Sequence, residues 1–514
     1  MQYAKVYGAQ TSLLSPYIVS IETDLSRGLH AFTVVGLPDK AVEESRDRVA
    51  AAIKHAGFES PKSRNQKIVI SLAPADLKKE GPMFDLPIAL SYLLAAGDIK
   101  FDPEPYIFVG ELSLDGALQP VRGLLPLVAE AKRRKKKAVF VPVENVEEAA
   151  LVPGINIYGV STLQEVIRFL NTKKSDNKKI EIKVAAQTKL RPDFGDSQFA
   201  FEDIRGQDSS KRAAIIAAAG GHNLGLSGPP GTGKTMLARA LASILPPLNF
   251  DDMLEVNSIH SVAGVLRGDL LTLPPFRSPH HTSSYVSIVG GGATPRPGEA
   301  TLAHKGVLFL DEFPEFERRV IEALRQPLED RVISVARAKG TAQFPARFTL
   351  VAAMNPCPCG NYGHPEIACT CTPMHLERYR RKISGPIADR IDLWSVMGPV
   401  ELGELGKRNR EGTETESARK RVLSARQAQT RRFYKTKNPN KTNSELSPRE
   451  LDDLVPLSQK VRELLEKAGT RMALSPRAFH RVIKVARTIA DLDEHPDINE
   501  SHILEALQYR EKKN

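Results

Sequence analysis

The chain has few cysteines, few aromatic residues and no long apolar run. Its four cysteines all lie between Cys357 and Cys371, which excludes a disulfide framework for 514 residues and favours a metal site. No apolar run reaches the roughly 18 residues that span a bilayer. The N-terminus has no basic segment followed by an apolar one. We therefore expect a soluble, cytoplasmic protein with no membrane partner.

Basic residues outnumber acidic ones, 72 to 61, which gives a formal net charge of +11. This balance weakly favours a polyanionic partner such as nucleic acid, because many soluble proteins are also basic. The length predicts more than one domain, and 41% hydrophobic residues are enough for large cores.

A glycine-rich stretch matches the pattern G-x-x-x-x-G-K-[ST] in full: Gly228, Pro229, Pro230, Gly231, Thr232, Gly233, Lys234 and Thr235. It follows a short apolar run and precedes a helical pattern, the strand–turn–helix context that this motif requires. Backbone N–H groups and the helix N-terminus would hold phosphate oxygens. Lys234 would reach the β- and γ-phosphates, and the Thr235 hydroxyl would coordinate Mg²⁺. The stretch, here called the phosphate loop, predicts a site for ATP and Mg²⁺.

Two later apolar runs end in polar residues. The run 306–312 ends in Asp311 and Glu312. Asp311 would hold Mg²⁺ through water, and Glu312 would orient and polarise the attacking water. The run 348–355 ends in Asn355, and in ATPases of the AAA+ class such an asparagine positions water near the γ-phosphate. An ordinary turn residue is the alternative for Asn355.

Two arginines are candidates for contacting the γ-phosphate. Residues 384–392 resemble the segment that carries the trans-acting arginine finger in magnesium-chelatase ATPases and minichromosome-maintenance helicases, and Arg390 matches that position. Residues 474–481 resemble the lid segment with the second sensor, where Arg477 matches. A planar guanidinium suits phosphate in either role, whereas a surface ion pair is the alternative for each.

Residues 1–170 alternate short strands and helices and predict an independent α/β domain. The segments 71–87 and 110–123 resemble the proteolytic domain of Lon proteases, which act through a Ser–Lys dyad. Met83 stands at the position of the nucleophile, and Leu124–Leu127 holds no lysine. We predict a Lon-like fold that does not cleave unfolded proteins in the presence of ATP.

The rest of the chain divides by composition. Residues 171–200 are polar and basic and predict a linker. Residues 201–400 carry the motifs that resemble those of AAA+ ATPases, and this resemblance implies a phosphate-loop α/β core with a parallel sheet. Residues 401–514 predict a C-terminal α-helical lid, with helical spacing over 417–433, 451–469, 478–491 and 499–511.

Residues 331–345 predict a hairpin whose turn is 338–341. In ring helicases with such hairpins a basic tip faces the central channel, so Arg337 and Lys339 are candidates for contacting DNA phosphates. A solvated turn is the alternative. A second insert, 276–305, has a flexible tip at 290–297. The basic run Lys132–Lys137 is either a solvated helix end or a phosphate-contacting patch.

The cysteines form two close pairs: Cys357 with Cys359, and Cys369 with Cys371. Four thiolates in two pairs suit tetrahedral Zn²⁺, although Cys-x-Cys is tighter than the more usual Cys-x-x-Cys. His364 and His375 are nearby substitute ligands. Free reduced thiols are the alternative.

Over essentially its full length the chain resembles the YifB/ComM family of magnesium-chelatase-like AAA+ ATPases. This resemblance implies a homo-hexameric ring with ATP between Lys234 of one subunit and Arg390 of the next. It also implies an ATP-driven branch-migration helicase that acts on single-stranded or branched DNA in recombination or natural transformation. The alternative is a chelatase-type or chaperone-like ATPase that acts on a protein partner and not on DNA.

Overall fold

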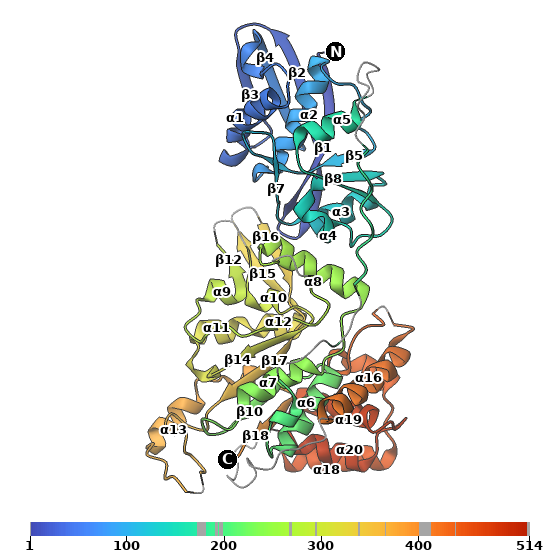
Figure 1. The fold of residues 1–514 in the computed structure, drawn as a ribbon. Coiled ribbons are helices and arrows are strands. Elements are labelled where there is room, and N and C mark those ends of the chain that lie inside the picture. The colour runs from blue at the N-terminus through green and yellow to red at the C-terminus, as the bar shows by residue number, and fades with distance from the viewer. Residues whose placement is uncertain are drawn as a thin grey trace. The chain divides into compact units, whose positions relative to one another are not determined.

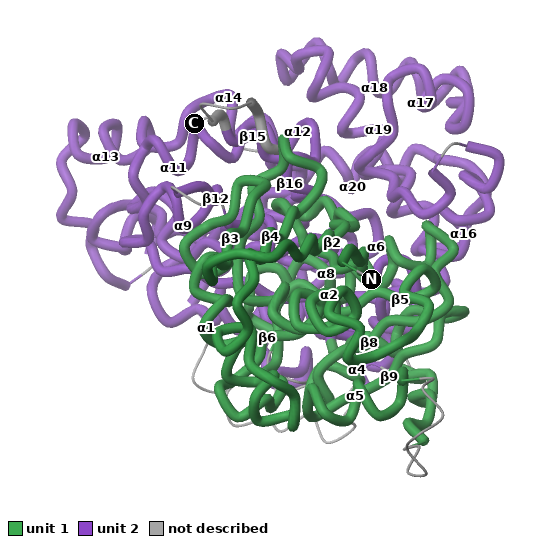
Figure 2. The backbone as a smooth tube through the Cα atoms, turned by 90° about the horizontal axis from the view of Figure 1, so that it is seen from above, with its two compact units in different colours: residues 1–191, 253–270 green, residues 192–252, 271–514 purple. Residues whose placement is uncertain are grey.

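The computed structural model describes residues 2–171, 181–190, 194, 199–266, 270–292, 296–337, 340–364, 366–399, 413–436 and 438–510, with backbone alone for 336–337 and 340–342. The chain forms two compact units (Figures 1 and 2). Unit 1 comprises Met1–Arg191 and Met253–Leu270, and unit 2 comprises Pro192–Asp252 and Leu271–Asn514. Residues 253–270 therefore group with unit 1, although they lie within the range that the sequence assigns to the ATPase core.

Unit 1 contains a four-stranded sheet in the order β1-β2-β4-β3 and a three-stranded parallel sheet in the order β5-β8-β9. Alternation decides which face is buried: in β4 the side chains of Ile68, Ile70 and Leu72 are buried and their neighbours are not. The strands are β1 (Tyr3–Ser12), β2 (Ser15–Arg27), β3 (Ala31–Val35), β4 (Gln66–Ala73), β5 (Tyr106–Phe108), β6 (Glu111–Leu112), β7 (Leu118–Gln119), β8 (Ala138–Pro142) and β9 (Asn156–Val160).

The helices of unit 1 are α1 (Lys40–His55), α2 (Asp85–Ala96), α3 (Leu124–Arg133), α4 (Val146–Ala149) and α5 (Leu163–Leu170). Helix α2 is buried almost all round and lies centrally in the core. Part of α8 (Phe250–Ala263) also belongs to this unit: the Gly123 N–H donates to Ser261 Oγ at 3.0 Å, and Leu254 packs against the core.

Unit 2 is built on a five-stranded parallel sheet in the order β11-β14-β17-β10-β18. Its strands are β11 (Phe276–Arg277), β14 (Val307–Leu310), β17 (Thr349–Met354), β10 (Leu224–Ser227) and β18 (Leu393–Val396). Strands β14 and β17 are buried at every position, as expected for a parallel sheet covered on both faces. All five strands point the same way, so residues that follow them meet at one edge of the sheet. The parallel sheet confirms the predicted α/β core.

Helices surround this sheet and continue into the C-terminal part of unit 2 (Figure 1). They include α6 (Asp208–Gly220), α7 (Lys234–Ser243), α9 (Tyr285–Val289), α10 (Glu299–Leu302), α11 (Arg318–Ala323), α12 (Arg325–Asp330), α13 (Pro373–Arg380), α14 (Gly385–Ala388), α16 (Glu414–Phe433), α17 (Pro448–Leu454), α18 (Gln459–Arg471), α19 (Pro476–Leu492) and α20 (Glu500–Gln508). The helical pattern over 451–469 is two helices, because Pro456 follows α17 and cannot donate the helical hydrogen bond.

Two antiparallel hairpins complete unit 2. Strand β12 (Gly290–Gly291) pairs with β13 (Arg296–Pro297), and β15 (Val332–Arg337) pairs with β16 (Gly340–Pro345). The second of these is the hairpin predicted from the sequence. A side chain at Gly291 would lie 3.8 Å from Val335 Cγ1, so the two hairpins are neighbours.

Candidate nucleotide-binding site

The phosphate loop connects β10 to α7, as its sequence context predicts. Gly231 and Gly233 have φ of 79° and 89°, a backbone region that favours glycine. Gly228 has no room for a side chain, because a Cβ there would lie 2.3 Å from the Met397 carbonyl oxygen. The loop is thus held in a tight turn at the carboxyl end of its strand.

Lys234 is buried, with 8% of its surface exposed. Its Nζ donates to the carbonyl oxygens of Gly228 and Pro229, at 2.7 and 2.8 Å, and to Asn355 Oδ1 at 3.2 Å. Burial lowers the pKa of the Lys234 ammonium, and Asp311 opposes this shift. A buried cation surrounded mainly by neutral acceptors is well placed to bind an anionic phosphate.

The residues predicted to bind Mg²⁺ lie together. Thr235 Oγ1 donates to Asp311 Oδ2 at 2.9 Å, which joins the first turn of α7 to the end of β14. A hydroxyl and a carboxylate at this distance are ligands that suit Mg²⁺ directly or through water. The structure therefore brings together Lys234, Thr235, Asp311 and Asn355 at one edge of the sheet.

Glu312 adopts a positive φ of 51°, which is uncommon for a residue with a side chain. Its carboxylate is half exposed, and Oε2 lies 2.9 Å from His281 Nδ1. His281 lies in the segment between β11 and α9, and the sequence alone assigned it no role. The two adjacent histidines, His280 and His281, are the sequence feature that could have indicated a role for His281. The His281 imidazole therefore contacts one of the two carboxylate oxygens of Glu312, the residue predicted to polarise the attacking water.

Arg390 and Arg477 lie together, away from the phosphate loop of their own chain. Both guanidinium groups pair with one carboxylate, that of Glu329 on α12: Arg390 Nη2 contacts Oε2, and Arg477 Nη2 lies 2.7 Å from Oε1. Arg390 is 8% exposed, and its Nε has no hydrogen-bond partner among the described residues. The arginine pair lines a polar cavity of about 410 Å³ with Arg331, Arg481 and Lys484.

This cavity lies at the amino end of the sheet. The Arg390 carbonyl accepts from Asn223 Nδ2 at 2.8 Å, and Asn223 directly precedes β10. The phosphate loop follows the same strand at its other end, about 13 Å away for a strand of four residues. Arg390 and Arg477 are thus at the edge of the sheet opposite Lys234. No feature of the sequence indicated Glu329.

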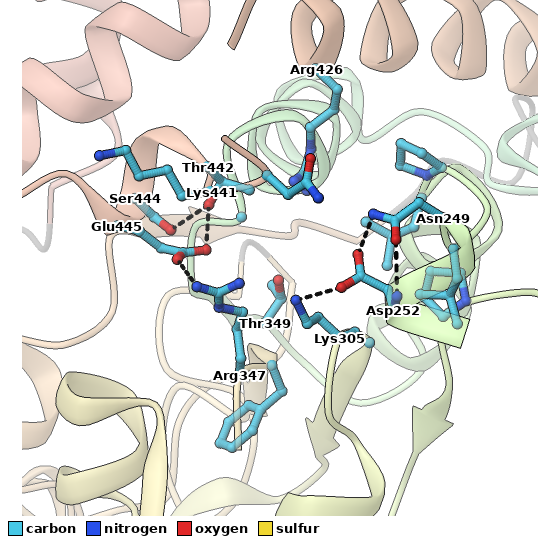
Figure 3. Close-up of a pocket in the computed structure, with 18 of the residues that line it drawn as sticks. Asn249, Asp252, Lys305, Arg347, Thr349, Arg426, Lys441, Thr442, Ser444 and Glu445 are labelled. Atoms are coloured by element: carbon cyan, nitrogen blue, oxygen red, sulfur yellow. Dashed lines mark hydrogen bonds and ion pairs between the residues drawn. The ribbon is translucent and has the colours of Figure 1, made fainter. Parts of the chain in front are cut away.

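A smaller cavity of about 250 Å³ lies at the same amino edge, between the sheet and the C-terminal helices (Figure 3). Its charges are paired across it: Arg347 with Glu445 and Lys305 with Asp252, both at 2.7 Å. The Arg347–Glu445 pair links the core to the C-terminal part of unit 2.

The four cysteine Sγ atoms all lie within 4.8 Å of one another. Three of their separations are 3.3, 3.6 and 3.7 Å. A Zn–S bond of about 2.3 Å in a tetrahedron places sulfur atoms roughly 3.8 Å apart, so the cysteine cluster fits this ion. Backbone N–H groups of Asn361 and Thr370 lower the pKa of Cys359, whereas burial and the neighbouring thiols raise the pKa of Cys369 and Cys371.

The predicted DNA contacts are only partly described. Arg337 ends β15, but its side chain is outside the description, and Lys339 lies outside the described residues altogether. Arg296, on the neighbouring hairpin, is exposed. Within the basic run 132–137, Arg133 and Arg134 pair with Glu130, and Lys136 pairs with Glu104.

Apolar side chains fill the positions of the Lon dyad. Met83 packs against the core of unit 1, and Leu124, Leu125 and Leu127 are buried.

Three family models match the chain. "Subunit ChlI of Mg-chelatase" matches residues 21–145, "Magnesium chelatase, subunit ChlI" matches 200–405, and its C-terminal model matches 412–510. "Competence protein ComM" of Haemophilus influenzae is 42% identical over 512 residues, which cover 99% of this chain and 98% of that protein. The chain belongs to the ComM and YifB family. This magnesium-chelatase-like AAA+ family indicates ATPase activity with ATP and Mg²⁺.

Other relatives agree with this assignment. "Uncharacterized protein YifB" of Salmonella typhimurium is 41% identical over 499 residues, covering 96% of this chain and 94% of that protein. "Lon protease 2" of Bacillus subtilis is 27% identical over 177 residues, covering 32% of this chain and 31% of that protein. The Lon-like part of the predicted fold is thereby confirmed. No helix in the described part of the chain is long and apolar enough to cross a membrane.

Proposed function

We propose that this chain is an ATP-driven motor that works as a homo-hexameric ring and remodels DNA. The observation that carries the proposal is the division of the predicted ATP machinery between opposite edges of one sheet. Lys234 and Asp311 lie at the carboxyl edge, whereas Arg390 and Arg477 pair with Glu329 at the amino edge. Arginines so placed act on ATP bound by a neighbouring subunit, and a ring gives every site such a neighbour.

Mixing inactive variants tests this shared site. Lys234→Ala subunits retain both arginines, and Arg477→Ala subunits retain the phosphate loop. If Arg477 acts in the neighbour's site, mixed rings contain some complete sites and recover measurable ATPase activity. The same holds for Arg390→Ala mixed with Lys234→Ala.

A mixture of Arg390→Ala and Arg477→Ala is the control, because each subunit then lacks one arginine that its neighbour needs. It should stay inactive. Recovery in this control, with none in the Arg477→Ala and Lys234→Ala mixture, would mean that Arg477 acts on ATP in its own subunit.

The proposed track is single-stranded or branched DNA. The net charge of +11, the neighbouring hairpins with Arg296 and Arg337, and the printed name of the competence relative support this choice. Competence and recombination both require DNA strands to be exchanged, so branch migration is the activity we propose. Hydrolysis at Glu312 would move the β15–β16 hairpin and carry DNA through the ring.

Lys339→Ala tests the hairpin. Loss of one phosphate contact should weaken DNA binding across sequences and reduce the salt slope by about one. Basal ATPase activity should stay near wild type, because the hairpin tip takes no part in hydrolysis. Unchanged binding of branched and single-stranded DNA over a salt series would contradict the assignment of the tip as a DNA contact.

A chelatase-type or chaperone-like ATPase with a protein partner is the second candidate, favoured by the family models named for magnesium chelatase. Stimulation of the ATPase rate by DNA, measured beside an unfolded protein and a chelatase partner, separates the two.

We also propose that the cysteine cluster holds a structural Zn²⁺ ion. The Sγ separations of 3.3–3.7 Å and the placement of all four Sγ atoms within 4.8 Å of one another support it.

A further inference from the structure

The cysteine cluster is joined to the nucleotide site along the chain. Asn355, whose Oδ1 lies 3.2 Å from Lys234 Nζ, comes two residues before Cys357. A single residue, Pro356, therefore separates Cys357 from the residue whose side chain contacts the phosphate-loop lysine.

The turn that follows the first pair of cysteines also lies against the phosphate loop. Gly360 follows Cys359, has φ of +84°, and would place a Cβ 2.7 Å from Pro230 Cδ. Its N–H donates to the Cys357 carbonyl oxygen at 3.0 Å, and the Tyr362 N–H donates to Cys357 Sγ at 3.3 Å. The turn around the first two sulfurs is thus packed directly against Pro230, inside the phosphate loop.

The second pair reaches the same site by another route. Helix α13 begins at Pro373, just after Cys371, and its N-cap Thr372 accepts from the His375 N–H. Tyr379 on this helix is buried, and burial raises the pKa of its hydroxyl; the nearby backbone of Asn355 opposes this shift, which places the hydroxyl beside Asn355. The two segments that carry the cysteines, 357–360 and 369–379, are here called the arms. Each arm lies beside a residue of the nucleotide site, and the four sulfurs lie where the arms meet.

We propose that the metal in the cysteine cluster positions the phosphate loop and Asn355, so that loss of the metal weakens ATP binding. This inference rests on the proposed nucleotide site and on the proposed zinc. A bound ion would hold the two arms together. Gly360 would then stay packed against Pro230, and Tyr379 would stay beside Asn355. Without the ion, no bond would join the four sulfurs, and the two arms could separate.

The direct test compares the full-length protein with and without its metal. Zinc is measured by elemental analysis, removed with a chelator under reducing conditions, and restored by adding one equivalent. Affinity for a fluorescent ATP analogue with Mg²⁺ should fall roughly tenfold on removal and return on restoration. Equal affinity before and after verified removal would overturn the coupling.

A pair of matched variants tests the contact itself. Gly360→Ala and Gly363→Ala introduce the same methyl group at similar positive φ, +84° and +78°, but nothing lies within 4 Å of a Cβ at Gly363. With zinc content verified as unchanged, Gly360→Ala should weaken ATP binding several-fold and Gly363→Ala should not. Tyr379→Phe, which removes only the hydroxyl beside Asn355, should also weaken ATP binding. Equal effects of the two glycine variants would overturn the proposed contact.

The outcomes separate the claims. Protein that holds about one equivalent of zinc but fails to bind ATP contradicts the nucleotide site. Protein with less than about half an equivalent contradicts the zinc assignment. Protein that holds zinc, binds ATP and is indifferent to zinc removal contradicts the coupling alone.

Discussion

Lys234→Ala is expected to weaken ATP binding by at least on the order of 100-fold, because several charge-assisted hydrogen bonds to phosphate are lost together. The wild-type ammonium is buried and partly desolvated before ATP binds, as the lowered pKa indicates. Much of its desolvation cost is therefore already incurred in the folded chain, and the phosphate gains a preorganised partner. Titration of a fluorescent ATP analogue with Mg²⁺ measures the effect.

Arg239→Ala is the matched control for Lys234→Ala. Arg239 lies on the same helix, α7, but is exposed and faces the Phe199 ring at 4.7 Å. Its removal lowers the net charge by the same amount and should leave ATP affinity near wild type. Equal loss of affinity in both variants would mean that charge alone, and not the site at Lys234, governs binding.

Glu312→Gln is expected to reduce the rate of ATP hydrolysis by roughly 10²–10⁴-fold while ATP binding is retained. The amide keeps the size and the hydrogen-bonding reach of the side chain but cannot polarise water as a carboxylate does. Steady-state hydrolysis and nucleotide binding measured on one preparation check this. ATP should accumulate in the unhydrolysed state and stabilise the ring.

Glu317→Gln provides the comparison for Glu312→Gln. Glu317 is exposed, precedes α11, and its side chain caps no helix N–H group. Its substitution should leave hydrolysis unchanged. If Glu312→Gln hydrolysed ATP at the wild-type rate, another group would have to activate the water.

The convergence of Lys234, Asp311 and Asn355 at one edge of the sheet in unit 2 could be predicted from the sequence because local patterns determine it. The phosphate loop, Asp311 and Asn355 each follow an apolar run, and parallel strands bring such positions to one edge without further information. The hairpin at 332–345 could be predicted for the same reason, since two β-rich segments flank a glycine-containing turn.

Features that depend on contacts distant in sequence could not be predicted. Glu329 is 61 residues from Arg390, and only the packing of α12 beside residue 390 brings their side chains together. The contact of Gly360 with Pro230 joins two loops in the same way. Residues 253–270 lie inside the range that the sequence assigns to the ATPase domain, but they group with unit 1, where Leu254 and Leu270 pack against the hydrophobic core.

The central claim is that ATP hydrolysis by this chain moves DNA strands. It is tested most directly by incubating the full-length protein with a four-way DNA junction with homologous arms, in MgATP at a stated low salt concentration. We predict ATP-dependent conversion of the junction to duplex products, absent with Glu312→Gln and without ATP. Hydrolysis that is unaffected by DNA and leaves the junction intact would contradict the claim.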